Sequence, residues 1–285
     1  MTLGHWGWDE GWAAEAAARN ADRSRVARIT GRDKGSWSLQ TEHGSRPARV
    51  PSSQGPHPFP VVGDWVVAEP GPHLTDPWSI RFVLARRSQI SRGAPGRGQE
   101  EQVLAANVDR VWIVHGLDVP GNLRRIERSI AVIWDSGASP EIVLTKTDLI
   151  FDLDSQISRI QQVAVGVPIR SVSSSDPESV QRLRGSLEPG STVCLLGPSG
   201  VGKSTLVNLL SGNVVARTGG VREKDRRGRH TTTRRSLFLI PGGACLLDTP
   251  GIRELRIWTL GAGLTGAFPD LEELAEACRF RDCQH

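Results

Sequence analysis

The run Gly197-Pro-Ser-Gly-Val-Gly-Lys-Ser204 constrains the fold more than any other feature of this sequence. It matches G-x-x-x-x-G-K-[ST], in which a glycine-rich backbone turns its N–H groups toward phosphate oxygens at the start of a helix. The apolar run Val193–Leu196 precedes it, and a helical pattern, Lys203–Leu210, follows. We therefore expect a triphosphate site in which Lys203 contacts the β- and γ-phosphates and Ser204 binds Mg²⁺. The residues expected to contact the nucleotide here are Gly197, Pro198, Ser199, Gly200, Val201, Gly202, Lys203, Ser204 and Thr205.

Two further motifs favour GTP as the nucleotide. The run L-L-D-T-P-G ends at Gly251; it leaves Asp248 at the end of a buried strand, where it can hold Mg²⁺ through water, and lets the Gly251 N–H reach the γ-phosphate. In Thr145-Lys146-Thr147-Asp148, the carboxylate of Asp148 can accept from guanine N1–H and N2–H₂ together, a pair that adenine does not offer. The stem of Lys146 can lie along the base. Alone, T-K-x-D also fits a solvated turn.

The order of these motifs indicates a circular permutation. A Ras-like GTPase has its phosphate loop first and its base-reading motif last. Here the base-reading motif (145–148) precedes the phosphate loop (197–204), and a threonine-rich segment, His230–Thr233, and then D-T-P-G (248–251) follow. The site survives because all these motifs lie on loops at the strand ends of one sheet.

Patterning divides the sequence into segments. Residues 1–24 are expected to be an N-terminal extension, amphipathic or frayed. Short alternating runs broken by Gly and Pro predict a closed β-barrel over 25–92, and Gly and Pro at 93–103 predict a linker. Apolar runs alternating with helical patterns predict a mainly parallel α/β domain with helices on both faces over 104–262. Residues 263–285 are expected to start a helical domain.

Composition excludes several classes of protein. No apolar run approaches the roughly 18 residues of a membrane helix, so we expect no membrane partner. We expect no signal peptide, because the first twelve residues contain no apolar block, and no disulfide framework, because Cys194 and Cys245 lie in apolar strand-like runs. We expect a cytoplasmic monomer. The net charge of +4 is compatible with a polyanionic partner.

Together with their flanks, these motifs make the chain resemble the family of small-ribosomal-subunit-dependent GTPases called RsgA or YjeQ. The resemblance covers nearly the whole chain. Besides the nucleotide motifs it rests on Val62-Gly63-Asp64-Trp65-Val66, Ala106-Asn107-Val108-Asp109, Gly228-Arg-His-Thr-Thr-Thr233 and Cys278-x₄-Cys283-x-His285. It implies an OB-fold barrel, a permuted P-loop GTPase domain and a helical zinc domain. The implied activity is GTP hydrolysis to GDP and phosphate in late maturation of the small (30S) ribosomal subunit, stimulated by that subunit.

The sequence departs from the family pattern at two places. The family's zinc pattern continues with a cysteine after the histidine, so we expect this sequence to be a fragment. One structural Zn²⁺ in the intact protein would bind Cys278, Cys283, His285 and that absent ligand. From spacing alone, Cys278 also fits a helix-face core thiol. The second departure is Thr145, where asparagine is commoner; it removes an amide that braces the loop.

Hydrolysis needs a group that orients the attacking water. Ras-like enzymes use a glutamine after D-x-x-G, but this chain has Ile252, which cannot polarise water, so intrinsic turnover should be slow. The resemblance offers His230 as a catalytic replacement; the alternative is an exposed switch residue. One threonine of 231–233 should complete the Mg²⁺ shell when GTP is bound, and we select Thr232. With Lys203, these are the expected catalytic residues.

Charge indicates an RNA partner in two segments. Residues 217–235 hold eight basic and two acidic side chains, and residues 81–97 hold five arginines and no acid. Such runs are often only solvated. Beside a barrel and a nucleotide switch they favour salt-dependent contact with ribosomal RNA. Trp37 and Trp65 could serve as stacking platforms, but barrel core is the favoured interpretation.

Other classes fit less well. A guanylate kinase would have its phosphate loop near the N-terminus and neither D-T-P-G nor T-K-T-D. An ABC-type ATPase would have glutamate after the strand-end aspartate, where this chain has Thr249, and an L-S-G-G-Q signature. A permuted GTPase family of the large subunit shares the motif order but lacks the barrel and the Cys-x₄-Cys-x-His pattern. An RNA-binding assembly factor whose GTPase only times release remains compatible.

Overall fold

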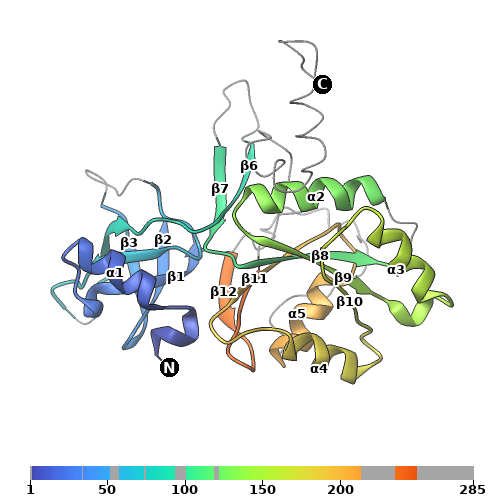
Figure 1. The fold of residues 1–285 in the computed structure, drawn as a ribbon. Helices are drawn as coiled ribbons and strands as arrows, with labels where there is room; N and C mark the ends of the chain where they lie inside the picture. Colours follow the sequence, from blue (N-terminus) through green and yellow to red (C-terminus); the bar gives the residue numbers. More distant parts are fainter. Residues whose placement is uncertain are drawn as a thin grey trace, which may run out of the picture.

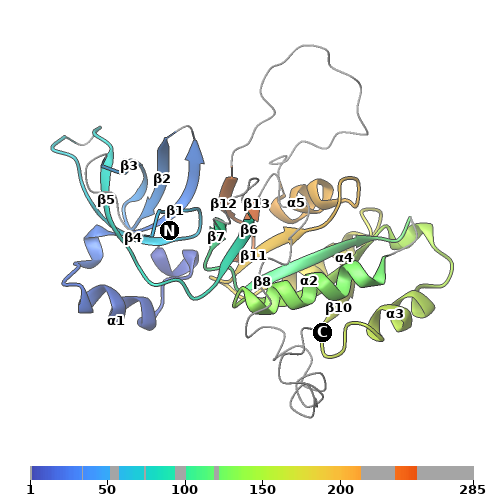
Figure 2. The same cartoon turned by 90° about the horizontal axis from the view of Figure 1, so that it is seen from above.

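The computed structural model describes residues 2–33, 35–51, 58–73, 75–93, 101–118, 122–212 and 235–248. Within these ranges a β-barrel lies beside an α/β sheet, with a two-stranded ribbon between them (Figures 1 and 2). None of the helices in these ranges is long and apolar enough to cross a membrane.

Five strands close the predicted barrel. Their order is β1–β2–β3–β5–β4, and β4 pairs back onto β1, as in an OB-fold. The bounds are β1 Val26–Asp33, β2 Ser36–Thr41, β3 Gly44–Arg49, β4 Trp65–Glu69 and β5 Trp78–Val83. Side chains alternate between core and solvent along β2, as expected for strands with one buried face. Trp37 and Trp65 are buried, so the prediction of barrel core is confirmed and neither is an exposed stacking platform.

The N-terminal extension is docked rather than frayed. It comprises the short 3₁₀ turns η1 (Leu3–Trp6) and η2 (Arg23–Arg25) and helix α1 (Glu10–Ala18). Trp8 and Trp12 place their rings 4.9 and 6.2 Å from the ring of Trp65. The physical reason is that large aromatic side chains in this short segment have a barrel surface on which to bury their area.

The predicted parallel sheet forms the other part of the fold. Strands β10–β9–β8–β11–β13 are parallel in that order, and β12 pairs antiparallel with β13. The strands are β8 Arg110–Gly116, β9 Ser139–Thr145, β10 Ile169–Ser171, β11 Thr192–Leu196, β12 Arg235–Leu239 and β13 Cys245–Asp248. The connecting helices are α2 Leu123–Asp135, α3 Leu153–Gln161, α4 Pro177–Gly185 and α5 Lys203–Ser211, with the 3₁₀ turn η3 Thr147–Leu149.

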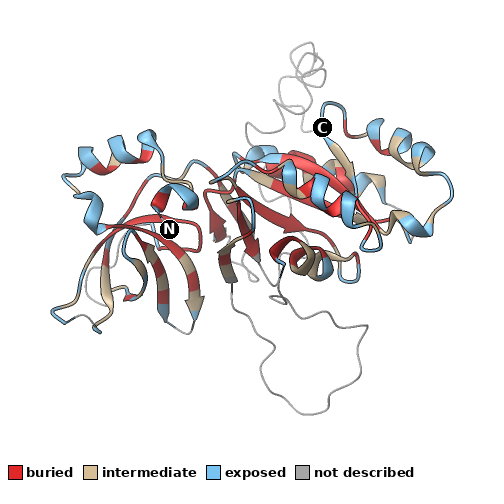
Figure 3. Cartoon of the chain, turned by 90° about the horizontal axis from the view of Figure 1, so that it is seen from below, coloured by how far each residue is buried: buried red, intermediate tan, exposed pale blue. Residues whose placement is uncertain are grey.

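Helices cover both faces of this sheet, as predicted. Helices α2 and α3 lie on one face and α4 and α5 on the other (Figure 1). Along β8, Val111 and Ile113 pack toward α2, while Trp112 and Val114 join the core beneath α4 and α5. The central strands are therefore buried on both sides (Figure 3), which explains their nearly continuous apolar sequence.

Two connections join the barrel to this sheet. Strands β6 (Gln89–Gly93) and β7 (Glu101–Ala106) form an antiparallel ribbon, so residues 101–103 of the expected linker lie in a strand. Strand β1 also pairs antiparallel with β12. One sheet of eleven strands therefore runs from the α/β part into the barrel. Cys194 and Cys245 are buried within β11 and β13, the apolar strands in which the sequence analysis places them.

Candidate functional site

Most of the predicted nucleotide residues lie at one edge of the parallel sheet. Strands β8, β9, β10 and β11 are parallel, so the loops that follow them leave from the same end. Ligands of open α/β sheets bind outside these carboxyl ends. The loop after β11 carries the glycine-rich run, and the loop after β9 carries the T-K-T-D run.

The glycine-rich loop has the backbone that its sequence predicts. At Gly197 a Cβ would lie 2.5 Å from the Val114 carbonyl oxygen, so the close approach of β11 to β8 requires glycine. Gly200 and Gly202 have φ of +86° and +96°, which side chains disfavour. Gly202 is the N-cap of α5. The loop thus ends at a helix N-terminus, where backbone N–H groups and the helix dipole favour an anion.

Lys203 is folded back over this loop. Its Nζ donates to the carbonyl oxygens of Gly197 (2.7 Å) and Pro198 (2.6 Å). Ser204 follows in the first turn of α5 and is half-buried, while Thr205 is exposed. The ammonium group of Lys203 and the hydroxyl of Ser204 therefore both lie where the loop joins α5. A phosphate and a hard cation require a positive charge and oxygen donors of this kind.

Thr145 joins the base-reading loop to the phosphate loop. It is the last residue of β9, is buried, and donates its hydroxyl to the Val201 carbonyl oxygen at 2.6 Å. Threonine lacks the amide of the commoner asparagine, but its hydroxyl supplies a brace of its own. A buried hydroxyl needs a partner, and this one fixes the distance between the two loops.

Lys146 and a residue that the sequence analysis missed form an ion pair. Lys146 has φ of +59°, and its Nζ lies 2.5 Å from Oδ2 of Asp118, in the loop after β8. The hydrogen bond from Lys146 lowers the pKa of the Asp118 carboxyl. The pair fixes the end of the lysine, leaving its stem at the base-reading loop. No motif marks Asp118, so only tertiary structure reveals it.

Asp148 is supported by a serine cluster that was also missed. The Ser173 hydroxyl, in the loop after β10, donates to Oδ1 of Asp148 and lies 2.7 Å from the Ser175 hydroxyl. The Ser173 N–H in turn donates to the Ser179 hydroxyl of α4 at 3.1 Å. The exposed carboxylate of Asp148 is thereby oriented while staying open to a base. A serine run after a three-residue strand was the only sequence signal.

The remaining predicted residues are placed only in part. Asp248 ends β13, whose parallel pairing with β11 brings its backbone to the same edge as the phosphate loop. The others lie outside the described residues; they are His230, Thr232, Gly251, Cys278, Cys283 and His285. Within the described ranges no group of three His, Cys, Asp or Glu side chains could hold a metal ion.

The structure changes the account of the basic segment 81–97. The side chain of Arg86 is only 8% exposed and donates to both carboxylate oxygens of Asp64 at 2.8 and 2.9 Å. Arg81 pairs with Glu69, and Arg87 with Asp9. Three of the five arginines are thus neutralised locally, and the excess charge on this segment is smaller than its sequence indicates.

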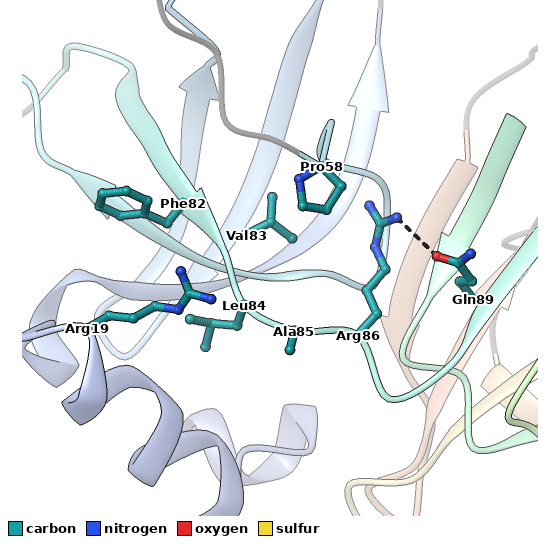
Figure 4. Close-up of a pocket in the computed structure, with 8 residues that line it drawn as sticks. All are labelled: Arg19, Pro58, Phe82, Val83, Leu84, Ala85, Arg86 and Gln89. Carbon is teal, nitrogen blue, oxygen red and sulfur yellow. Dashed lines mark hydrogen bonds between the residues drawn. The ribbon is translucent and has the colours of Figure 1, made fainter. Parts of the chain in front are cut away.

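A hollow on the barrel lies apart from the P-loop edge. It measures about 290 Å³ and lies between the end of α1 and the segment from Phe82 to Gln89 (Figure 4). Arg86 on its wall donates to the Gln89 side chain at 3.4 Å, to the Phe59 carbonyl oxygen at 2.9 Å and to the carboxylate of Asp64. Its cationic wall is therefore used in internal pairing.

Comparison with known proteins gives consistent matches. The family model described as RsgA GTPase matches residues 83–258. The chain is 38% identical to small ribosomal subunit biogenesis GTPase RsgA 2 of Vibrio vulnificus, over 100% of this chain and 79% of that protein. It is 41% identical to the corresponding RsgA of Streptomyces avermitilis, over 98% of this chain and 76% of that protein.

Two solved structures share the fold. The crystal structure of YjeQ from Thermotoga maritima has a TM-score of 0.64 and 22% identity, over 92% of this chain and 86% of that one. That of YloQ, described as a circularly permuted GTPase, has a TM-score of 0.62 and 20% identity, over 91% and 83%. The predicted fold class, a barrel with a circularly permuted P-loop domain, is therefore confirmed.

Proposed function

The chain belongs to the RsgA GTPase family, and from this premise we propose that it hydrolyses GTP in the biogenesis of the small ribosomal subunit. One observation of the site carries the proposal. The phosphate loop and the T-K-T-D loop, 52 residues apart in sequence between their first residues, are joined by the hydrogen bond from Thr145 to Val201. This hydrogen bond holds the proposed base-reading loop next to the proposed phosphate loop.

Guanine selectivity follows from the base-reading loop. Asp148 would accept from N1–H and N2–H₂ of guanine, with Ser173 orienting the carboxylate. Lys146, held by Asp118, would cover the base with its stem. Adenine presents no matching pair of donors, so ATP would leave the carboxylate without them.

Phosphate chemistry follows from α5 and its loop. Lys203 would leave the Gly197 and Pro198 carbonyls for the β- and γ-phosphates. The Ser204 hydroxyl, with Thr232 and water held by Asp248, would bind Mg²⁺, because hard oxygen donors suit this ion. When bound, Mg²⁺ neutralises charge on the phosphates. The Gly251 N–H would contact the γ-phosphate.

Water activation is assigned to the segment before β12. We assign the role of orienting the attacking water to His230, whose imidazole can accept and donate a proton near neutral pH. The position that follows D-T-P-G is Ile252, which has no hydrogen-bonding group. Slow intrinsic turnover and stimulation by a partner are consistent with that residue.

The partner proposed is the small subunit with its ribosomal RNA, in the cytoplasm. The relatives' names and the charge of residues 217–235 support it. We also propose one structural zinc ion on Cys278, Cys283 and His285 in the intact protein, with a fourth ligand beyond His285.

Co-sedimentation with purified small subunits tests the partner. We expect the chain to pellet with subunits when a non-hydrolysable GTP analogue is bound and to be released with GDP. Phosphate contacts should make binding fall steeply between about 50 and 200 mM salt. Equal pelleting with large subunits, or no dependence on the nucleotide, would contradict the proposal.

A further inference from the structure

Two motifs that contribute nothing to the nucleotide site meet where the barrel joins the parallel sheet. They are Val62–Val66, which enters β4, and Ala106–Asp109, which enters β8. Gly63 lies so near the second motif that a Cβ would be 2.0 Å from the Ala106 carbonyl oxygen. The Asn107 side chain donates to the Gly63 carbonyl oxygen at 3.2 Å. The motifs therefore build a packed junction rather than an exposed surface.

Arg28 of strand β1 lies inside this junction. Its side chain is buried, with 2% of the residue exposed. It donates to the carbonyl oxygens of Gly63 (3.3 Å) and Asn107 (3.0 Å), to the Thr192 hydroxyl (2.7 Å) and to the Trp6 carbonyl oxygen. One guanidinium thus connects the N-terminal extension, the barrel, the entry to β8 and the first residue of β11.

All four acceptors of Arg28 are neutral. Burial lowers the pKa of its guanidinium, because water no longer solvates the charge. A buried guanidinium is tolerated only when its N–H donors are satisfied, so a shift of any one partner leaves a buried donor unpaired. The junction therefore has one favoured geometry and resists small displacements.

Strand β1 reaches the nucleotide edge by two routes. Thr192, the acceptor of Arg28, begins the strand whose far end opens into the phosphate loop, about 13 Å away at 3.3 Å per residue. Farther along β1, Gly31 pairs with Ser236 of β12. Ser236 also pairs with Asp248, the last residue of β13. Strand β1 thus contacts β11, which leads into the phosphate loop, and β12, which pairs with Asp248.

We propose that strand β1 couples the barrel to the nucleotide site and that Arg28 is its positioning residue. Arg28 acts through Thr192 and never touches the nucleotide. The inference rests on the proposed function for the identity of the nucleotide. Because coupling between two sites is reciprocal, bound nucleotide must alter the stability of β1, and a ligand on the barrel must alter nucleotide affinity.

Hydrogen exchange of the β1 amides, with GDP or a non-hydrolysable GTP analogue, tests this coupling. In the wild-type chain we expect the two nucleotides to give exchange rates in β1 that differ at least about fivefold, the lower end of typical coupling. Thr192→Val keeps the side-chain shape and removes one acceptor of Arg28. Arg28→Met removes the guanidinium and with it all four hydrogen bonds. Both should reduce the difference, leaving only what passes through the pairing of β1 with β12, whereas Arg49→Met, on the exposed face of β3, should keep it in full.

The outcomes separate the two proposals. Nucleotide affinity is measured on the same samples. Binding without a nucleotide-dependent change in β1 would overturn the coupling, and an unchanged difference in folded Thr192→Val would overturn the positioning role of Arg28. Either result would leave the GTPase intact. Failure to bind either nucleotide would refute the proposed function and the coupling with it. If Arg28→Met does not fold, Thr192→Val alone tests whether Arg28 acts through Thr192.

Discussion

Thr145 and Asp148 lie three residues apart in the base-reading loop and make different contacts. Thr145 is buried and bonds to the phosphate loop, while Asp148 is exposed and is oriented by Ser173. The sequence alone is enough to propose a base-reading role for Asp148, because that role depends on the carboxylate itself and on the T-K-x-D run around it. It did not predict the brace from Thr145 or the support from Ser173, since those depend on which loops the sheet places side by side.

Asp148→Asn should change the base that the site prefers. An amide presents a donor where the carboxylate accepted, so guanine loses its N2–H₂ partner and xanthine, with a carbonyl at that position, gains one. We expect preference to move from GTP toward XTP in competition binding. Retained preference for GTP would show that Asp148 does not read the base.

Thr145→Val should weaken nucleotide binding without unfolding the domain. It leaves the Val201 carbonyl unpaired, a loss of about 1–2 kcal/mol, which corresponds to roughly tenfold in the Kd for GDP. Thr145→Ser keeps the hydroxyl and should bind GDP nearly as wild type. Titration calorimetry compares the three, and equal affinities of the Val and Ser variants would refute the brace.

At the scale of elements, the strands and helices were largely predictable and their docking was not. Two-residue alternation marked the barrel strands, and continuous apolar runs marked β8, β9, β11 and β13. The extension was misjudged because helix α1 has no clear apolar stripe; its Trp12 is buried against the barrel. Pairing of β1 with β12 joins residues about 200 apart, and no local pattern encodes it.

Gly63 offers a test of the junction at this scale. Gly63→Ala introduces strain at φ of +95° and a Cβ 2.0 Å from Ala106, so we expect a loss of about 2–5 kcal/mol in the free energy of unfolding. Gly35→Ala is the matched control, with φ of +93° and nothing within 4 Å. For Gly35→Ala, urea unfolding should show a loss of only about 1–2 kcal/mol in the free energy of unfolding. Similar losses at both positions would contradict the close approach.

Docking of the extension should depend on pH through Asp9. Asp9 caps α1 and accepts from Arg87 at 2.6 and 2.7 Å. Arg87 lowers the pKa of the Asp9 carboxyl below its usual 3.8, so the folded state favours the ionised form. The stabilisation is therefore complete above about pH 4 and is lost as the pH falls through the lowered pKa.

The comparison of wild type with Asp9→Asn isolates this effect. Because Asp9 and Arg87 are about half exposed, we expect at most about 1 kcal/mol between the free energies of unfolding of the two proteins at pH 7. The difference should disappear as the pH falls through the lowered pKa of Asp9. Urea titrations at several pH values measure it. A difference that stays constant with pH would assign the contact to packing rather than charge.

At the scale of the whole molecule, one continuous sheet and one buried arginine join the barrel to the nucleotide domain. The motif order predicted a permuted site, and the structure shows why permutation is tolerated: the loops that matter leave the same edge. Charge counts predicted a basic segment at residues 81–97, but Asp64, Glu69 and Asp9 pair with three of its five arginines. Ion pairing depends on neighbours in space, which a count along the sequence cannot include.

Phosphate release from GTP and ATP, with and without purified small subunits, tests the central claim most directly. We expect hydrolysis of GTP alone, slow by itself, rising sharply with subunits and less so at high salt. Lys203→Ala should abolish it, because the phosphates lose their cation. Equal turnover of ATP would contradict the guanine site, and GTP turnover indifferent to small subunits would contradict the role in their biogenesis.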